Sequence, residues 1–208
     1  MTLANFQWPA PSVGIRQIAK LAHTLRHPDL GDEFGLSEKA MAAPAQPTFP
    51  NACHICEVEI DPQTGECEIT RYCVVDDVGR MINPMLVKGQ VLGGVAQGVG
   101  QILLESIQFD EYGQLITGSF MDYAMPRASD LPDIICKSNE VLTQGNPLGA
   151  KGAGEAGTVG ALAAVVNAVV DALASLGVEH VEMPITSESL WRTIRAAETH
   201  LSEQRQER

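Results

Sequence analysis

Basic residues are scarce in this sequence of 208 residues, which has 14 Lys and Arg against 26 Asp and Glu and a formal net charge of −12. A nucleic-acid partner requires clustered Lys and Arg that neutralise phosphates. Binding to an anionic membrane surface requires a basic amphipathic stretch. The sequence has neither pattern, so we expect no nucleic acid and no membrane among its partners.

Cysteine and long apolar runs are limited as well. The five cysteines are an odd number without a framework spacing, which favours a reducing compartment, so we expect a cytoplasmic protein. The first residues, MTLANFQWPAPSVGIRQ, lack the basic start and apolar run of a secretory signal. The longest apolar stretch, residues 159–176, is interrupted by Gly160, Asn167 and Asp171 and predicts a buried helix rather than a membrane span.

The spacing of apolar residues predicts an α+β fold in which hairpins alternate with helices. A β-hairpin is expected around the turn Asp61–Gly65, with strands at residues 53–60 and 66–76. The expected helices cover residues 12–25, 87–107 and 158–176, the last followed by the C-cap residue Gly177, and the chain from Thr186 onward. Further strands are expected at residues 106–109, 114–120, 134–142 and 178–183, and loops at residues 28–50 and 144–157.

These elements divide the chain into an N-terminal helix with a connecting loop (residues 1–50), a main domain (residues 51–201) and a disordered tail (residues 202–208). The helix expected at residues 87–107 carries five glycines, each of which costs roughly 1 kcal/mol relative to Ala in a helix. Such a helix needs very close packing against another surface. We therefore expect an apolar, glycine-rich groove along residues 89–105 to be exposed in the isolated chain.

Two polar clusters are weak candidates for a site. Cys53 and Cys56 have the spacing of a metal site, but residues three apart on a strand point to opposite faces, and no second pair completes a tetrahedral site. We expect buried strand cysteines and no metal ligand. Asp76 and Asp77 suggest paired carboxylates, but they precede Gly79 at a strand end and are interpreted as a solvated turn.

The stretch KGAGEAG, residues 151–157, places the pattern G-x-G-x-x-G ahead of a helix. A dinucleotide-binding turn needs a strand before its first glycine and an acidic residue at the end of a second strand. Here the preceding residues form a loop, and Asp171 lies inside the helix. Because Glu155 also stands among the amides that would bind an anion, a phosphate- or nucleotide-binding module is only a weaker alternative.

Glu155 is the one carboxylate in this loop, and two interpretations of it are open. A carboxylate that is partly shielded from water at the start of an apolar helix can serve as a general base. Alternatively, Glu155 caps the helix, where the helix dipole favours a negative charge. The residue spacing alone favours the cap.

Several motifs occur in one order along the chain: VDDVGRMINP (75–84), GQVLGGVAQGVGQILLE (89–105), TGSFMDYAMPRASDLP (117–132), NPLGAKG (146–152), KGAGEAGTVGA (151–161) and MPITSESLWRTI (183–194). Together they resemble the C-terminal part of the large, molybdopterin-binding subunit of the xanthine dehydrogenase and aldehyde oxidase family. The nearest resemblance is to the bacterial branch with aerobic carbon monoxide dehydrogenase-like large subunits. The likeness covers residues 48–197, so it rests on several independent motifs.

The resemblance implies a role for each matching residue. Glu155 matches the family's catalytic glutamate, a base at a Mo–OH group, and Gln97 matches a glutamine beside the pterin. The loop that wraps the molybdenum end of the cofactor matches Lys151, Gly152, Ala153 and Gly154. Residues 51–201 are then the molybdenum cofactor-binding domain, and molybdopterin with Mo, in its cytosine dinucleotide form, is the expected cofactor.

The resemblance also implies a reaction and a set of partners. The reaction is the oxidation of an aldehyde, an N-heterocycle or a similar small substrate with water-derived oxygen. Iron–sulfur and flavin subunits are expected to carry the [2Fe–2S] clusters and FAD. Large subunits of the family are several hundred residues long, so we expect activity only together with the remaining part of the large subunit. The alternative is a truncated or structural fragment without catalysis.

Overall fold

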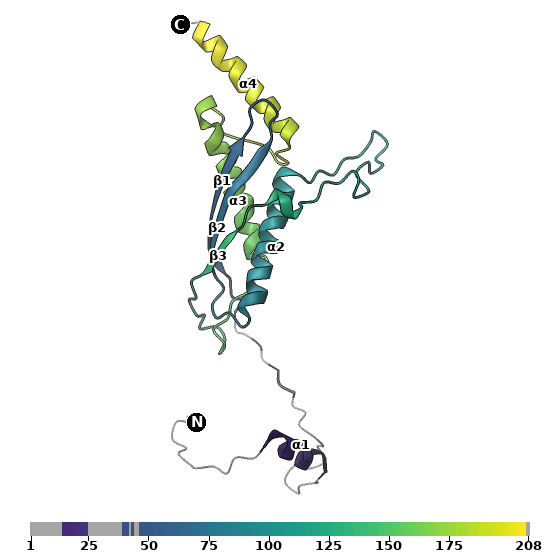
Figure 1. Cartoon of the computed structure of the whole chain (residues 1–208), viewed down its shortest axis with the longest axis vertical. Helices are drawn as coiled ribbons and strands as arrows, with labels where there is room; N and C mark the ends of the chain where they lie inside the picture. Colours follow the sequence, from purple (N-terminus) through teal and green to yellow (C-terminus); the bar gives the residue numbers. More distant parts are fainter. Residues whose placement is uncertain (1–13, 25–38, 42, 44–45, 207–208) are drawn as a thin grey trace. The chain divides into compact units, whose positions relative to one another are not determined.

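The computed structural model describes residues 14–24, 39–41, 43 and 46–206 (Figure 1). The chain separates into two compact units, with the division between Ala43 and Pro44. In the first unit, helix α1 (Ile15–Thr24) confirms the helix expected near the N-terminus. Most of the loop expected at residues 28–50 lies outside the described residues.

The second unit contains a mixed three-stranded sheet with the order β1-β2-β3. Its strands are β1 (Asn51–Ile60), β2 (Cys67–Asp77) and β3 (Ile135–Ser138). β1 and β2 form the predicted antiparallel hairpin, whereas β3 runs parallel to β2. The hairpin turn depends on Gly65, which has a φ of 73° and whose Cβ would overlap the carbonyl oxygen of Ser187.

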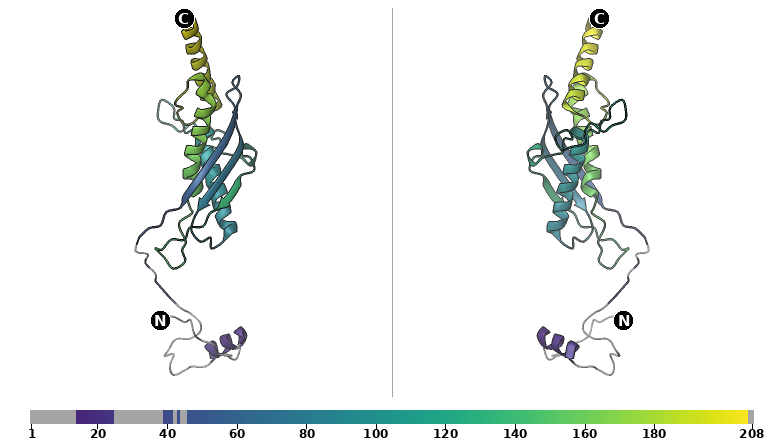
Figure 2. Two further views of the ribbon diagram at one scale, coloured as in Figure 1. Left: turned by 90° about the vertical axis from the view of Figure 1, so that its left-hand side faces the viewer. Right: turned by 90° about the vertical axis from the view of Figure 1, so that its right-hand side faces the viewer.

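Two helices, α2 (Pro84–Leu103) and α3 (Ala156–Leu173), lie together on one face of this sheet (Figures 1 and 2). Helix α3 packs against β1 and against α2, and the buried core lies between the helices and the sheet. Among the buried core residues are Tyr72 and Val74 of the sheet, Val91, Val95 and Val99 of α2, and Ala161, Val165 and Val169 of α3. On the opposite face of the sheet, Ile55, Val75 and Ile135 are exposed.

The glycines of α2 allow its backbone to contact α3. A Cβ on Gly94 would lie 3.0 Å from the Cα of Gly157, and a Cβ on Gly98 would lie 2.7 Å from the Cβ of Ala161. The prediction that the glycines require close packing is therefore confirmed at these positions. The expected exposed groove along residues 89–105 is wrong at Gly94 and Gly98, which are buried against α3, whereas Gly89 and Gly93 on another face of α2 are exposed.

Helix α2 begins three residues earlier than the apolar spacing predicts. Asn83 is its N-cap, and the side-chain oxygen of Asn83 accepts hydrogen bonds from the amides of Met85 and Leu86. Pro84 occupies the first helical turn, where its missing N–H costs no hydrogen bond. Local capping thus sets the start of this helix.

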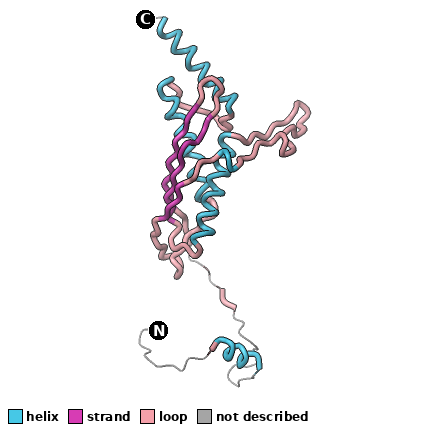
Figure 3. The backbone as a smooth tube through the Cα atoms, viewed as in Figure 1, coloured by secondary structure: helices cyan, strands magenta, loops and turns pink. Residues whose placement is uncertain are grey.

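Several other boundaries differ from the sequence-based expectations. In place of strands at residues 106–109 and 114–120 there is one isolated bridge, between Phe109 and Leu115. The segment 178–183 contains no strand, and β3 is shorter than the range 134–142. These segments have strand-like composition, but no neighbouring strand pairs with them along their length. The long loops that result are visible in Figure 3.

The last helix, α4 (Ser187–Gln206), extends into the segment 202–208, which the sequence analysis expects to be a disordered tail. Local interactions support its final turns. Arg195 pairs with Glu198 at 2.9 Å, and the hydroxyl of Ser202 donates a hydrogen bond to the carbonyl of Thr199. Polar residues with good helix propensity continue the helix without a buried face.

The segment from Ala156 to Leu176, which is α3 with the following short 3-10 turn η3 (Ala174–Leu176), is long and apolar enough by length and composition to cross a membrane. In this structure its apolar face packs on α2 and β1, with Ala161, Val165, Val169 and Leu173 buried. Gly177 follows with a φ of 75°, which confirms it as the C-cap residue.

Candidate functional site

The glycine loop, residues 151–155, connects the loop after β3 to the first turn of α3. It borders an open pocket of about 580 Å³. One side of this pocket is formed by Phe49, Pro50, Asn51 and Ala52, where the chain enters β1, and the other by Gly152, Gly154, Glu155, Ala156, Val159 and Gly160. The pocket therefore joins two parts of the sequence that are about one hundred residues apart.

Glu155 is the N-cap residue of α3 by its backbone, because its carbonyl oxygen accepts a hydrogen bond from the amide of Val159 at 3.1 Å. Its side chain accepts no capping hydrogen bond and is exposed at the pocket. The interpretation of Glu155 as a side-chain cap is therefore wrong. Its carboxylate is free for other chemistry in the pocket.

The two glycines of the loop leave space on the pocket side. A Cβ on Gly154 would meet no heavy atom within 4 Å, and one on Gly152 would have only the carbonyl oxygen of Thr48 nearby, at 3.8 Å. Neither residue has a positive φ. Because the fold of the chain itself does not demand glycine at these positions, their small size keeps the backbone accessible to a ligand in the pocket.

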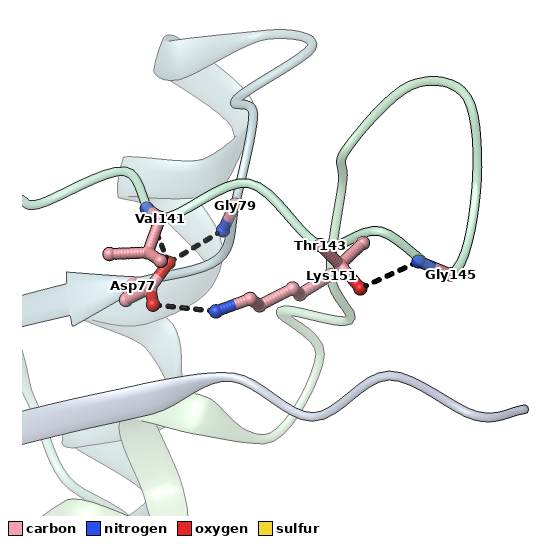
Figure 4. A network of polar contacts seen from close by, with 6 residues as sticks. All are labelled: Asp77, Gly79, Val141, Thr143, Gly145 and Lys151. Carbon is pink, nitrogen blue, oxygen red and sulfur yellow. Dashed lines mark hydrogen bonds and ion pairs between the residues drawn. The ribbon is translucent and has the colours of Figure 1, made fainter.

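Lys151 is bound to the sheet rather than free at the pocket. Its ammonium lies 2.6 Å from a carboxylate oxygen of Asp77 at the end of β2, and the two side chains are only 11% and 13% exposed (Figure 4). The hydrogen bond from Lys151, with further ones from the amides of Gly79 and Val141, lowers the pKa of Asp77 to about 2. Asp77 is therefore a bound anion, and its interpretation as part of a solvated turn is wrong.

Asp76 is also not solvated, because it is only 2% exposed. It follows the alternation of Tyr72 and Val74 on the inward face of β2, and neither of its carboxylate oxygens has a hydrogen-bond partner among the described residues. Burial raises its pKa. The period of two along the strand is the sequence signal for this burial, and the neighbouring Asp77 and the nearby Gly79 obscured it.

The other expected site residues lie close to the start of α3. Gln97 of α2 is exposed, and its side-chain oxygen accepts a hydrogen bond from the hydroxyl of Thr158 at 3.4 Å. Ala153 is half-buried between the two glycines of the loop. Gln90 of α2 is a further residue at this site that was not expected from the sequence; its amide nitrogen donates a hydrogen bond to the carbonyl oxygen of Gly154 at 2.7 Å. Nothing in the local sequence distinguishes Gln90 from a solvated helix residue.

A half-buried histidine, His54 of β1, supports the pocket from the sheet. Nδ1 of His54 lies 2.7 Å from the hydroxyl of Tyr72, and burial lowers the pKa of His54. The ring lies against Gly160, where a Cβ would overlap it. Gly160 also lines the pocket, so the glycine lets the His54 ring pack directly behind the pocket wall.

Cys53 and Cys56 point to opposite faces of β1, as the strand period predicts. Cys56 is half-buried against the core, and burial raises its pKa to about 12. Cys53 is exposed, so the prediction of a buried cysteine is wrong there. Among the residues that the structure describes, no group of three or more His, Cys, Asp or Glu side chains could hold a metal ion.

Comparison with known proteins identifies the family. Residues 4–132 match the family model of the molybdopterin cofactor-binding domain. The chain is 40% identical over 162 residues to the nicotine 6-hydroxylase large subunit of Paenarthrobacter nicotinovorans, covering 78% of this chain and 20% of the relative. It is 35% identical over 181 residues to the carbon monoxide dehydrogenase large chain of Hydrogenophaga pseudoflava, covering 86% and 22%.

The fold agrees with this assignment. The reconstituted CO dehydrogenase from Oligotropha carboxidovorans superposes with a TM-score of 0.80 at 32% identity, covering 89% of this chain and 23% of that chain. The chain therefore belongs to the molybdopterin cofactor-binding domain family. It spans about a fifth of the length of the relatives it matches.

The residues at the pocket fit a molybdopterin cofactor. The accessible backbone at Gly152 and Gly154 offers amides and carbonyls to a polar ligand, and Glu155 offers a free carboxylate next to them. The pocket lining contains no Lys or Arg, and the ammonium of Lys151 is already bound to Asp77. The carboxylate of Glu155 beside these amides would repel a phosphate, so the lining suits the molybdenum end of the cofactor better than its phosphate end.

Proposed function

We propose that this chain forms the Glu155-bearing wall of the active site in a molybdenum hydroxylase large subunit. The observation that carries the proposal is the state of Glu155, an uncapped carboxylate at the mouth of an open pocket, on a loop hydrogen-bonded to the sheet and to α2. The names of the relatives, nicotine 6-hydroxylase and carbon monoxide dehydrogenase, support oxidation of a small molecule. An aldehyde or N-heterocycle is the substrate class that we propose.

When bound, the cofactor supplies a molybdenum centre that carries a hydroxyl group and accepts two electrons from the substrate. Glu155 would serve as the general base that accepts a proton there, in an oxidation whose oxygen comes from water. The ion pair with Asp77 occupies the ammonium of Lys151, the one cation of the glycine loop. Gly152, Ala153 and Gly154 would hold the molybdenum end of the cofactor through their backbone, and Gln97 would contact the pterin.

The remaining part of the large subunit completes the site in this proposal. In the present structure Glu155 is exposed, and a general base is more effective when water is excluded. The cofactor is the cytosine dinucleotide form of molybdopterin, and iron–sulfur and flavin subunits receive the electrons through [2Fe–2S] clusters and FAD. The names "large subunit" and "large chain" of the relatives support such an assembly, and we propose that it is cytoplasmic.

A non-catalytic fragment is the second candidate. The observation that favours it is the open pocket, which the described residues line from two segments of the chain. This candidate predicts that the chain purifies without the rest of a large subunit and without molybdenum. Metal and pterin content of the complex isolated through a tag on this chain separate the two.

The catalytic role is tested by Glu155→Gln in that complex, because Gln keeps the size of the side chain and cannot accept the proton. We expect kcat to fall by about 10²–10⁴-fold while molybdenum and pterin content stay near normal. Glu182→Gln, another exposed glutamate outside the pocket, is the matched control and should retain activity. Near-normal activity per molybdenum in Glu155→Gln would contradict the proposal.

A further inference from the structure

One carboxylate joins three segments of the chain at the start of the glycine loop. Oδ1 of Asp77 accepts hydrogen bonds from the amides of Gly79 at 2.9 Å and Val141 at 3.0 Å, and Oδ2 accepts one from the ammonium of Lys151 at 2.6 Å (Figure 4). The end of β2, the loop after β3 and the glycine loop are thereby connected at one side chain. Because the pair is largely shielded from water, its hydrogen bonds are little weakened by competition with solvent.

Backbone contacts at the same place hold the glycine loop to the sheet. The amide of Lys151 donates to the carbonyl of Val78 at 2.8 Å, and the amide of Arg80 donates to the carbonyl of Gly149 at 3.0 Å. Gly79 has a φ of 62°, and a Cβ on it would overlap the carbonyl oxygen of Gly149. Only glycine permits this approach, so the N-terminal end of the loop is closely fitted to the end of β2.

The other end of the loop is held by α2. The side-chain amide of Gln90 donates to the carbonyl of Gly154, the residue immediately before Glu155. Gly94, one turn further along α2, contacts the backbone of Gly157 and Thr158 in the first turn of α3. Gln90 and Gly94 are four residues apart and lie on one face of α2. Helix α2 therefore contacts the glycine loop just before Glu155 and helix α3 just after it.

We infer that Asp77 and Gln90 are positioning residues that fix the two ends of the glycine loop and thereby the place of Glu155. Space is open beside the loop between these anchors, since a Cβ on Gly152 would have only the carbonyl oxygen of Thr48 nearby, at 3.8 Å. A general base must reach its proton within hydrogen-bond distance, and a displacement of about 1 Å can cost about 10²-fold in rate. The catalytic part of the inference rests on the proposed function, whereas the effect on the loop does not.

Hydrogen exchange of the purified chain tests the loop directly, with variants Asp77→Asn and Gln90→Met. We expect the amides of residues 149–157 to exchange about 5-fold faster in Gln90→Met, which corresponds to one hydrogen bond of about 1 kcal/mol, and faster still in Asp77→Asn. Gln101→Met, at an exposed position of the same helix, is the matched control and should leave exchange unchanged. Unchanged exchange of residues 149–157 in both Asp77→Asn and Gln90→Met would overturn the inference.

Unfolding of Asp77→Asn would appear as lost protection of the hairpin, residues 51–77. Gln90→Met would then decide alone, since it removes one hydrogen bond at an exposed side chain.

In the assembled enzyme both variants should lower kcat by about 10–10²-fold with molybdenum content retained. If Glu155→Gln proves active while exchange still rises in these variants, the proposed function fails and the anchoring of the loop stands. Full activity of both variants with a loosened loop would overturn the catalytic part of the inference.

Discussion

Two long loops of this domain differ in what holds them. The segment after β3, residues 139–155, is bonded to the sheet and to α2 through Asp77, Gln90 and backbone amides. The projecting arm, residues 104–127, leaves the end of α2 and extends away from the body (Figure 1). Its large apolar side chains are exposed, with Phe120 at 87% and Met121 at 94%.

The arm is ordered by local hydrogen bonds rather than by packing. Asp110 accepts hydrogen bonds from the amides of Tyr112 and Gln114 within the turn, and the hydroxyl of Tyr123 donates to Glu105 at the base. By contrast, the conformation of the loop bearing Glu155 is set by contacts with the sheet and with α2. Substitutions should therefore have large effects around that loop and small effects in the arm.

The largest effect on stability is expected where the start of α3 meets α2. A Cβ introduced by Gly157→Ala would overlap the carbonyl oxygen of Val91 and lie 3.0 Å from the amide nitrogen of Val95. Because both are helix backbone atoms, the two helices must separate, and we expect a loss of about 1–3 kcal/mol in the free energy of unfolding. Urea unfolding of the purified chain measures this change.

Two further glycine-to-alanine variants serve as controls for the effect of Gly157→Ala on the free energy of unfolding. Gly93→Ala, at an exposed position of α2 with no atom within 4 Å of its Cβ, should stabilise the chain by about 0.5–1 kcal/mol. Gly118→Ala in the arm meets only Leu115, at 3.6 Å, and should change stability by less than about 0.5 kcal/mol. A loss at Gly118 as large as at Gly157 would show that the arm is as tightly packed as the body.

Substitutions in the Asp77–Lys151 pair should have an intermediate effect on the free energy of unfolding, and this effect should depend on pH. The pKa of Asp77 is about 2 in the folded chain against an ordinary value of 3.8, so its contribution is complete above about pH 5 and is lost as the pH falls through 4 towards 2. Buried Asp76, with its raised pKa, acts in the opposite direction. The difference between the unmodified chain and Asp77→Asn therefore isolates Asp77.

This difference in the free energy of unfolding should be largest near neutral pH and should disappear near pH 2. Lys151→Met removes the main cause of the low pKa of Asp77. This variant should therefore reduce the pH-dependent contribution of Asp77 to the free energy of unfolding. Chemical unfolding of the three proteins between pH 2 and 7 measures it. A difference that stays constant over this range would mean that Asp77 does not titrate with a depressed pKa.

The smallest effect on stability is expected at the tip of the arm. Phe120→Ser and Met121→Ser replace exposed side chains, so each should change the free energy of unfolding by less than about 0.5 kcal/mol. Binding of a fluorescent apolar dye should fall, because the exposed apolar area shrinks. A loss above about 2 kcal/mol would mean that the arm packs on the body in solution.

Local patterns predicted the elements that depend on local contacts. The hairpin around Asp61–Gly65 and the two glycine- and alanine-rich helices follow from periodicity and turn chemistry. The strands expected at residues 106–109 and 114–120 did not form, because alternation describes a strand but cannot supply a neighbour to pair with. The sequence also predicted that Glu155 is the only carboxylate in the loop that borders the pocket.

The contacts that hold the glycine loop in place could not be predicted from local sequence patterns. Asp77 and Lys151 are 74 residues apart, and Gln90 and Gly154 are 64 apart, so only the tertiary fold brings each pair together. Asp76 is different, since its place in the alternation of Tyr72 and Val74 does predict an inward side chain. Its adjacent partner Asp77 gave the misleading impression of a solvated turn.

The central claim is that Glu155 is the proton acceptor on a loop that this chain holds in place. Its most direct test is the single-turnover rate of substrate oxidation per molybdenum, measured anaerobically in the assembled enzyme so that electron transfer to partner subunits does not limit it. The account predicts a rate reduced by about 10²–10⁴-fold in Glu155→Gln and a normal rate in Glu182→Gln. An equal rate in Glu155→Gln and the unmodified enzyme, with equal molybdenum content, would contradict it.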